Sequence, residues 1–195
     1  RGLLKNATGN KLVFEEHHTE LQLVFRYSWA PCDEFGWVRT ASIENLGEAA
    51  LEVQILDGLR NILPFGAPLG LYQTSSTLVD AYKKTEVDGL TGLGIVSLTA
   101  GITDRAEALE VLRANTIWCS GLEEFRVHIS LDTLDDFRQG RVLAEEHLQN
   151  GGRGHYLVTS LLEIEAGTTE SWRLIGDTGR DHLQIAKLRR LILAA

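Results

Sequence analysis

Alternation of apolar and polar side chains with a period of two is the feature that most constrains the fold of this chain. Successive side chains of a strand point to opposite faces, so such a run predicts a strand with one buried face. In residues 21–27 four side chains share a face: Leu21, Leu23, Phe25 and Tyr27. Other long alternating runs occupy residues 37–43, 51–56 and 156–165. Shorter runs occupy residues 12–15, 94–99, 116–119, 125–129 and 170–174. We therefore predict a mostly β, antiparallel fold with one buried and one wet face per strand.

Turn residues between these runs predict two β-hairpins. Asn45 and Gly47 lie between the runs 37–43 and 51–56 and can adopt the unusual φ angles of a tight turn. Gly167 does the same between the runs 156–165 and 170–174. Within residues 37–43 the alternation is imperfect, which predicts a bulge between Val38 and Ile43.

Helical patterns are few. Residues 181–193 carry an apolar stripe at helical spacing, formed by Ile185, Leu188 and Ile192. Asp132 is a suitable N-cap for a short helix over residues 132–138, and residues 141–148 predict a turn or a further helix. The stripe of the last helix predicts a linker to another domain. We thus expect a β-sandwich domain over residues 1–177 and a linker helix over residues 178–195.

Composition narrows the classes of function. The chain of 195 residues has 19 basic and 27 acidic side chains, a net charge of −8, which disfavours binding to nucleic acid or to an anionic membrane. No apolar run is long enough to span a bilayer. Cys32 and Cys119 are expected to be free thiols in a reducing, cytoplasmic compartment. The chain contains no methionine, and we expect it to be a piece of a larger protein.

A metal site at His17 and His18 is not expected, although the pair follows Glu15 and Glu16. Neighbouring residues of a strand point to opposite faces, so the two imidazoles cannot easily share one ion. No third ligand stands at a recognisable spacing. We predict neither a metal nor a cofactor.

Three groups of polar and aromatic residues are candidates for contacting a sugar. Asp57, Arg60 and Asn61 lie at the end of a predicted strand, where they can bracket hydroxyl groups. The polar segment 75–86 contains Asp80, Tyr82 and Lys84, and Trp37 with Trp29 flanks an acidic loop. Aromatic rings stack on the apolar C–H faces of sugars, and polar groups meet the hydroxyl rim.

Each candidate also has a structural interpretation. Asp57 and Arg60 could pair internally to fix a loop, Tyr82 could be half-buried on a paired strand, and tryptophans are often core residues. These alternatives stay open at the level of the sequence.

Four segments together resemble the amino-terminal β-supersandwich region of cellobiose-phosphorylase-like proteins. They are FGWVRT (residues 35–40), IENLG (43–47), LDGLRNILP (56–64) and LVDAYK (78–83), in this order. The resemblance implies an antiparallel two-sheet supersandwich of the galactose-mutarotase-like type. It also implies a glycoside phosphorylase or hydrolase in which this domain packs, through a helix, onto an (α/α)₆ catalytic domain. No motif of that catalytic domain is present, so no catalytic residue is carried over.

The function expected from the resemblance is therefore that of a non-catalytic domain, which supports or rims the active site of a carbohydrate-active enzyme. One alternative is a stand-alone aldose-epimerase-like enzyme, with His128 or His155 acting with Glu163 or Glu165. Another is a purely structural interaction domain, and a homodimer stays among the arrangements to be tested.

Overall fold

The computed structural model describes residues 1–103 and 109–195 and is mostly β. Its strands form two antiparallel sheets, which confirms the predicted fold class, and its described residues include four short helices. None of the described helices is long and apolar enough to cross a membrane. In chain order the elements are β1 (Gly2–Lys5), β2 (Leu12–His18), β3 (Leu23–Pro31), β4 (Trp37–Asn45), β5 (Leu51–Ile62), α1 (Leu69–Thr74), α2 (Ser76–Tyr82), β6 (Lys83–Val87), β7 (Gly94–Leu98), β8 (Arg113–Ser120), β9 (Arg126–His128), α3 (Thr133–Arg138), β10 (Leu148–Asn150), β11 (Gly154–Ile164), β12 (Thr169–Asp181) and α4 (His182–Leu193).

The chain divides into two compact units, and each consists of segments that are far apart in the sequence. Unit 1 contains Arg1–Ile55, Cys119–Phe125 and Thr159–Gly176. Unit 2 contains Leu56–Trp118, Arg126–Val158 and Asp177–Ala195. The bounds of β5, β8, β11 and β12 cross these divisions, so each of the four strands contributes residues to both units.

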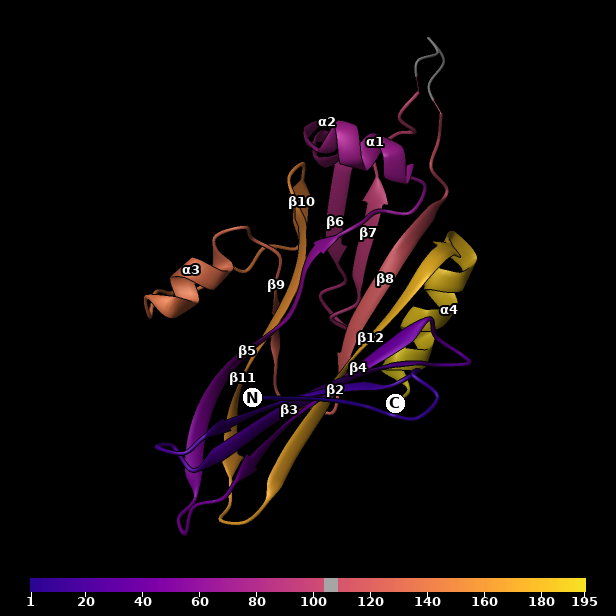
Figure 1. Cartoon of the computed structure of the whole chain (residues 1–195). Helices are drawn as coiled ribbons and strands as arrows, with labels where there is room; N and C mark the ends of the chain where they lie inside the picture. Colours follow the sequence, from indigo (N-terminus) through magenta and orange to yellow (C-terminus); the bar gives the residue numbers. More distant parts are fainter. Residues whose placement is uncertain (104–108) are drawn as a thin grey trace. The chain divides into compact units, whose positions relative to one another are not determined.

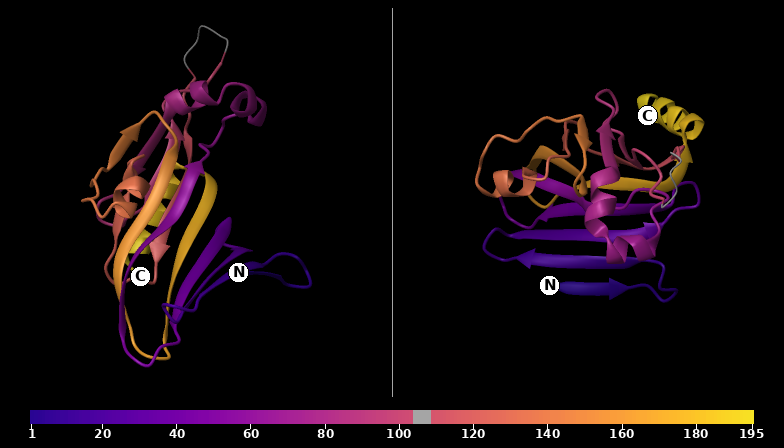
Figure 2. Two further views of the ribbon diagram at one scale, coloured as in Figure 1. Left: turned by 60° about the vertical axis from the view of Figure 1, so that its left-hand side comes forward. Right: turned by 90° about the horizontal axis from the view of Figure 1, so that it is seen from above.

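In unit 1, β1, β2, β3, β4 and the first part of β12 are neighbours in one antiparallel sheet. Figure 2 shows β1 to β4 lying side by side. The register places Phe14 opposite Tyr27, and Tyr27 and Trp172 on either side of Ala41. The predicted face is confirmed for Leu23, Phe25 and Tyr27, which point the same way, but Leu21 lies in the turn before β3 and is exposed.

The expected bulge in β4 is absent. β4 pairs in continuous register with both β3 and β12, so Arg39, Ala41 and Ile43 share the buried face. The prediction was wrong because an arginine usually faces solvent, whereas Arg39 lies on the buried face of β4. The core of unit 1 on this sheet and on β11 is formed by Leu23, Ala41, Ile43, Leu162, Ile164, Trp172 and Leu174.

Both predicted hairpins are wrong. β4 and β12 belong to the larger sheet, whereas β5 and β11 belong to the three-stranded sheet, so each turn passes from one sheet to the other. Asn45 connects the two turns: its Nδ2 donates to the carbonyl oxygens of Ala49 and Ile164, at 2.8 and 2.9 Å. Its main-chain N–H donates to Thr168. Local alternation predicts a strand but carries no information on which sheet receives it.

In unit 2, β8, β7, β6 and β10 are neighbours in antiparallel order, and the three-stranded sheet has the order β5, β11, β9. The core contains Val79, Leu93, Val96, Ile129, Tyr156 and Val158. Gly94 leaves room for the Tyr156 ring, since a Cβ at Gly94 would lie 2.5 Å from Cδ2 of that ring. The Tyr156 hydroxyl donates to the carbonyl of Gly92 at 2.7 Å. The glycine-rich segment before β7 is a turn, in which the N–H groups of Thr91 and Gly92 donate to the carbonyl of Asp88.

The helix predicted over residues 181–193 is confirmed as α4. Asp181 and Gln184 form a capping box at its start, and Arg189 pairs with Asp88 at 3.0 Å. The predicted short helix is confirmed as α3, but Asp132, at its N-cap position, makes no side-chain capping hydrogen bond. Residues 141–147 have no regular structure.

A strand paired in the sheet was one of the alternatives for the segment 75–86, and the structure bears it out for residues 83–86 only. Its first half is the helix α2, and its second half belongs to the strand β6. Figure 1 shows α1 and α2 at the end of the sheet where β6 begins.

Candidate functional site

Six aromatic side chains gather on one face of the sheet in unit 1. We call this surface the aromatic face; it consists of Phe14, Phe25, Tyr27, Trp29, Trp37 and Trp172. Two pairs define its geometry: the rings of Phe14 and Tyr27 stack at 4.7 Å and 11°, and those of Trp29 and Trp37 lie 5.1 Å apart at 47°. Phe25 continues the row to Trp172, with ring centroids 6.5 Å apart.

The aromatic face is not a fully closed core. Trp172 is only 1% exposed, but the other five side chains are half-buried and keep accessible surface. The guanidinium of Arg39 lies 4.6 Å from the Tyr27 ring centroid, a cation–π contact that holds a charge against the row. Gly176 gives Trp37 its space, since a Cβ there would lie 2.0 Å from the indole ring.

Of this face, the sequence singled out only the pair Trp29 and Trp37. The phenylalanines and Tyr27 were visible as strand residues, but the register that brings them together is a property of strand pairing. Regular spacing of aromatics within the run 21–29 is the one sequence signal that could have identified them.

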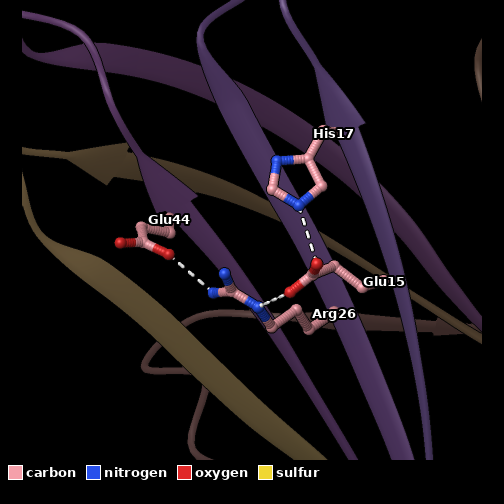
Figure 3. A network of polar contacts seen from close by, with 4 residues as sticks. All are labelled: Glu15, His17, Arg26 and Glu44. Carbon is pink, nitrogen blue, oxygen red and sulfur yellow. Dashed lines mark hydrogen bonds and ion pairs between the residues drawn. The ribbon is translucent and has the colours of Figure 1, made fainter. Parts of the chain in front are cut away.

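The opposite face of the same sheet carries a closed network of charges (Figure 3). Arg26 donates through Nε to Glu15 and through Nη1 to Glu44 at 2.6 Å, and His17 lies 2.7 Å from Glu15. The hydrogen bonds of Arg26 and His17 lower the pKa of Glu15, and Glu44 together with Glu15 raises the pKa of Arg26. Each charge has a partner, so this network has a structural role.

His17, a member of that network, and His18 point to opposite faces of β2, as expected from their adjacency. His17 faces Glu15, whereas His18 lies 3.7 Å from Glu16. Within residues 1–103 and 109–195, no group of three acidic, histidine or cysteine side chains is arranged to hold a metal ion. Cys32 and Cys119 are not joined by a disulfide.

The other predicted sugar-contacting residues all lie in unit 2, where the structure does not form them into a single cluster. Asp57, Arg60 and Asn61 are on β5, with Arg60 and Asn61 exposed. Asp80 and Tyr82 are on α2, and Lys84 on β6 pairs with Glu86 at 2.9 Å. Asp80 turns instead toward Lys83.

Lys83 is the residue of this region that sequence reasoning missed. It is 1% exposed, and its Nζ lies 2.7 Å from Oδ1 of Asp80, in an ion pair without hydrogen-bond geometry. The same ammonium group lies 5.1 Å from the Tyr72 ring centroid. A lysine at the start of a strand gives no sign in the sequence that it will be buried.

His128 and His155, the candidate acid–base histidines, are both buried. The Nδ1 of His128 lies 2.9 Å from the Ala144 carbonyl, and that of His155 lies 3.1 Å from the Gly154 carbonyl. Burial lowers the pKa of His155, and the charges of Arg60, Arg153 and Lys83 lower it further. Glu163 and Glu165, their proposed partners, are exposed.

Comparisons with known proteins found no match in sequence and only a weak similarity in structure. No protein-family model matches the sequence, and no curated protein matches it. Among solved structures the chain is similar to the Slr1438 protein of Synechocystis sp. PCC 6803, with 10% identity and a TM-score of 0.42. The match covers 91% of this chain and 65% of Slr1438, so the chain corresponds to less than two thirds of that protein. This likeness carries no functional argument.

Proposed function

We propose that the chain is a non-catalytic β-sandwich domain of a carbohydrate-active enzyme and that it contacts carbohydrate through the aromatic face. The observation that supports this is the row of five half-buried aromatic side chains on β2, β3 and β4. Such rings can stack on the C–H faces of pyranose units. Glu16, which shares this face of β2 and is half-buried, suits the hydroxyl rim of a sugar.

The non-catalytic part of the proposal is supported by the electrostatics of the carboxyl groups. A general acid for glycoside chemistry needs a carboxyl pKa above its ordinary value. The carboxyl groups with a resolved shift among the described residues, Glu15, Glu16 and Asp88, all have a lowered pKa. They are suited to ion pairing rather than to proton donation.

The parent enzyme in this proposal is a glycoside phosphorylase or hydrolase, as the family resemblance implies. Its (α/α)₆ catalytic domain would be the partner of the present chain and would supply the acid–base groups. The sugar and the linkage are left to experiment.

Saturation-transfer NMR with cellobiose, α-glucose and α-galactose tests the proposal. We expect transfer from the protein to at least one sugar, weakened at least several-fold by Trp37→Ala. Tyr82→Ala tests the aromatic residue of unit 2 that was also expected to contact a sugar. Val142→Ala, at a fully exposed apolar side chain, is the matched control and should leave the transfer unchanged. Thermal melting of each variant distinguishes loss of contact from loss of fold.

Two results would overturn the proposal in different ways. Faster anomerisation of α-glucose than in buffer, abolished by heating the protein, would favour the aldose-epimerase-like enzyme. Absence of transfer to all three sugars with concentrated protein would favour a purely structural interaction domain.

A further inference from the structure

A cavity of about 210 Å³ lies in unit 1, at the end of the sheet where β2 turns into β3. We call it the hairpin cavity; two apolar and four polar residues line it, namely Leu23, Leu46, His17, His18, Thr19 and Gln22. Pockets for drug-sized ligands have volumes of roughly 300–1,000 Å³. The hairpin cavity is smaller, so it suits one ring-sized group, and its mixed lining suits a group with both an apolar face and polar edges.

Main-chain hydrogen bonds hold the walls of the hairpin cavity in place. Gln22, in the turn between β2 and β3, has a left-handed backbone with φ of 50°. Its carbonyl accepts the N–H of Leu46 at 2.7 Å, and its own N–H donates to the Thr19 carbonyl at 3.3 Å. A Cβ at Gly47 would lie 3.2 Å from Oε1 of Gln22, so the glycine leaves room for this side chain. The two turns that form the cavity are therefore joined to each other.

The hairpin cavity adjoins the aromatic face. In the register of β2 with β3, His18 lies opposite Leu23, and the next pair on the same face is Glu16 with Phe25. Leu23 and Trp29 are six residues apart on β3, a path of about 20 Å at the rise of a strand. A pyranose ring is much shorter than this path. The cavity and the aromatic face can thus hold different rings of one sugar chain.

The charges near the hairpin cavity favour an uncharged ligand. Its described lining residues include neither lysine nor arginine, the side chains that bind oxyanions most strongly. Glu20 lies in the turn between β2 and β3, and a carboxylate oxygen of Glu16 lies 3.7 Å from Nε2 of His18. A sugar with a carboxylate or a phosphate group would be repelled by these side chains.

We propose that the hairpin cavity binds one ring of a neutral oligosaccharide whose further rings lie along the aromatic face. The inference rests on the proposed function and narrows its ligand from sugars in general to oligosaccharides. Leu23 and Leu46 contact the C–H face of the bound ring. The Thr19 hydroxyl and the Gln22 amide, which can both donate and accept, exchange hydrogen bonds with its hydroxyl groups.

Isothermal titration of the full chain with glucose, cellotetraose and maltotetraose tests the proposal. We expect at least one tetrasaccharide to bind about 10-fold more tightly than glucose, because it occupies the cavity and the aromatic face together. The double variant Thr19→Val, Leu46→Ala should weaken that binding at least about 5-fold. Both side chains are exposed, so thermal melting should be unchanged. Leu161→Ala with Thr169→Val is the matched control, at exposed residues of unit 1 outside the cavity.

The ring signals of His17 and His18 in the proton NMR spectrum give a second readout. They are assigned by their absence in His17→Gln and His18→Gln. Addition of the tetrasaccharide should move them, because both residues line the cavity. The ring signal of His182, at the start of α4 in unit 2, should stay in place. Tetrasaccharide binding that leaves the His17 and His18 signals unmoved would overturn the inference.

The variants separate this inference from the proposed function. A tetrasaccharide whose binding is weakened by Trp37→Ala but not by the cavity variant would overturn the inference and leave the proposed function standing. Weakening by the cavity variant alone would uphold the cavity and overturn the role of the aromatic face. A tetrasaccharide that binds no more tightly than glucose would overturn the inference. Absence of heat with all three sugars at about 10 mM would overturn both proposals.

Discussion

At the scale of single residues, buried polar groups set the constraints in unit 2. Lys83 is the clearest case, because an ammonium group loses its hydration on burial and depends on Asp80 for compensation. His155 is a second case, since the uncharged ring is favoured by its surroundings. The free energy of unfolding therefore depends on the charge of the Lys83–Asp80 pair and on the protonation of the His155 ring.

Asp80→Asn should destabilise the chain by about 3 kcal/mol, because it leaves the Lys83 charge buried without a counter-charge. Adding Lys83→Met should recover most of that loss. Glu86→Gln is the control, since the partly exposed Lys84–Glu86 pair is expected to contribute at most about 1 kcal/mol. Urea unfolding measures the free energy of unfolding of these three variants. A loss for Asp80→Asn no larger than that for Glu86→Gln would contradict a role for the buried pair.

His155 should make the free energy of unfolding depend on pH. Its pKa is lowered in the folded chain, whereas the unfolded chain has the ordinary value of about 6.5. The stabilisation is complete above that value and is lost as the pH falls toward the folded pKa, because the unfolded state takes up the proton first. His155→Gln should show a smaller loss of stability between neutral and mildly acidic pH. Equal pH dependence in both proteins would show that other groups are responsible.

At the scale of elements, the strands were predicted well and their partners were not. The strands β3, β4, β5 and β11 and the helix α4 follow from local periodicity and capping. The two turns at Asn45 and Gly167 were read as hairpins, because Asn and Gly are typical of tight turns. In the structure they cross between sheets, and Asn45 bonds to both turns.

Asn45→Ala should lower the free energy of unfolding by about 2–3 kcal/mol. The substitution removes the side-chain bonds to Ala49, Ile164 and Gly47 at a position only 1% exposed, and it leaves main-chain groups without partners. Asn150→Ala, at an exposed position on β10, should change stability by less than about 0.5 kcal/mol. Similar values for the two variants would show that the turns do not depend on Asn45.

At the scale of the whole molecule, charge is the property that the sequence already defines. The net charge of −8 opposes association with polyanions. Division into two units is, in contrast, invisible in the sequence, because each unit is built from three separate segments.

The chain should therefore fail to bind duplex DNA at physiological salt. Binding would require several phosphate contacts from clustered basic side chains, with affinity that falls steeply as salt rises. Fluorescence anisotropy of a labelled duplex, measured at low and physiological salt, checks this. Saturable binding at physiological salt would show that a basic surface outweighs the net charge.

The sequence by itself determined that this protein is mostly β, which faces of its longest strands are apolar, and where its last helix begins. Those properties depend on residues a few positions apart, and alternation and capping report them directly. Only the tertiary structure decided that the aromatic rings form one face and that Lys83 is buried against Asp80. These arrangements depend on pairing between segments distant in the sequence, and no local pattern encodes which strand becomes the neighbour of which.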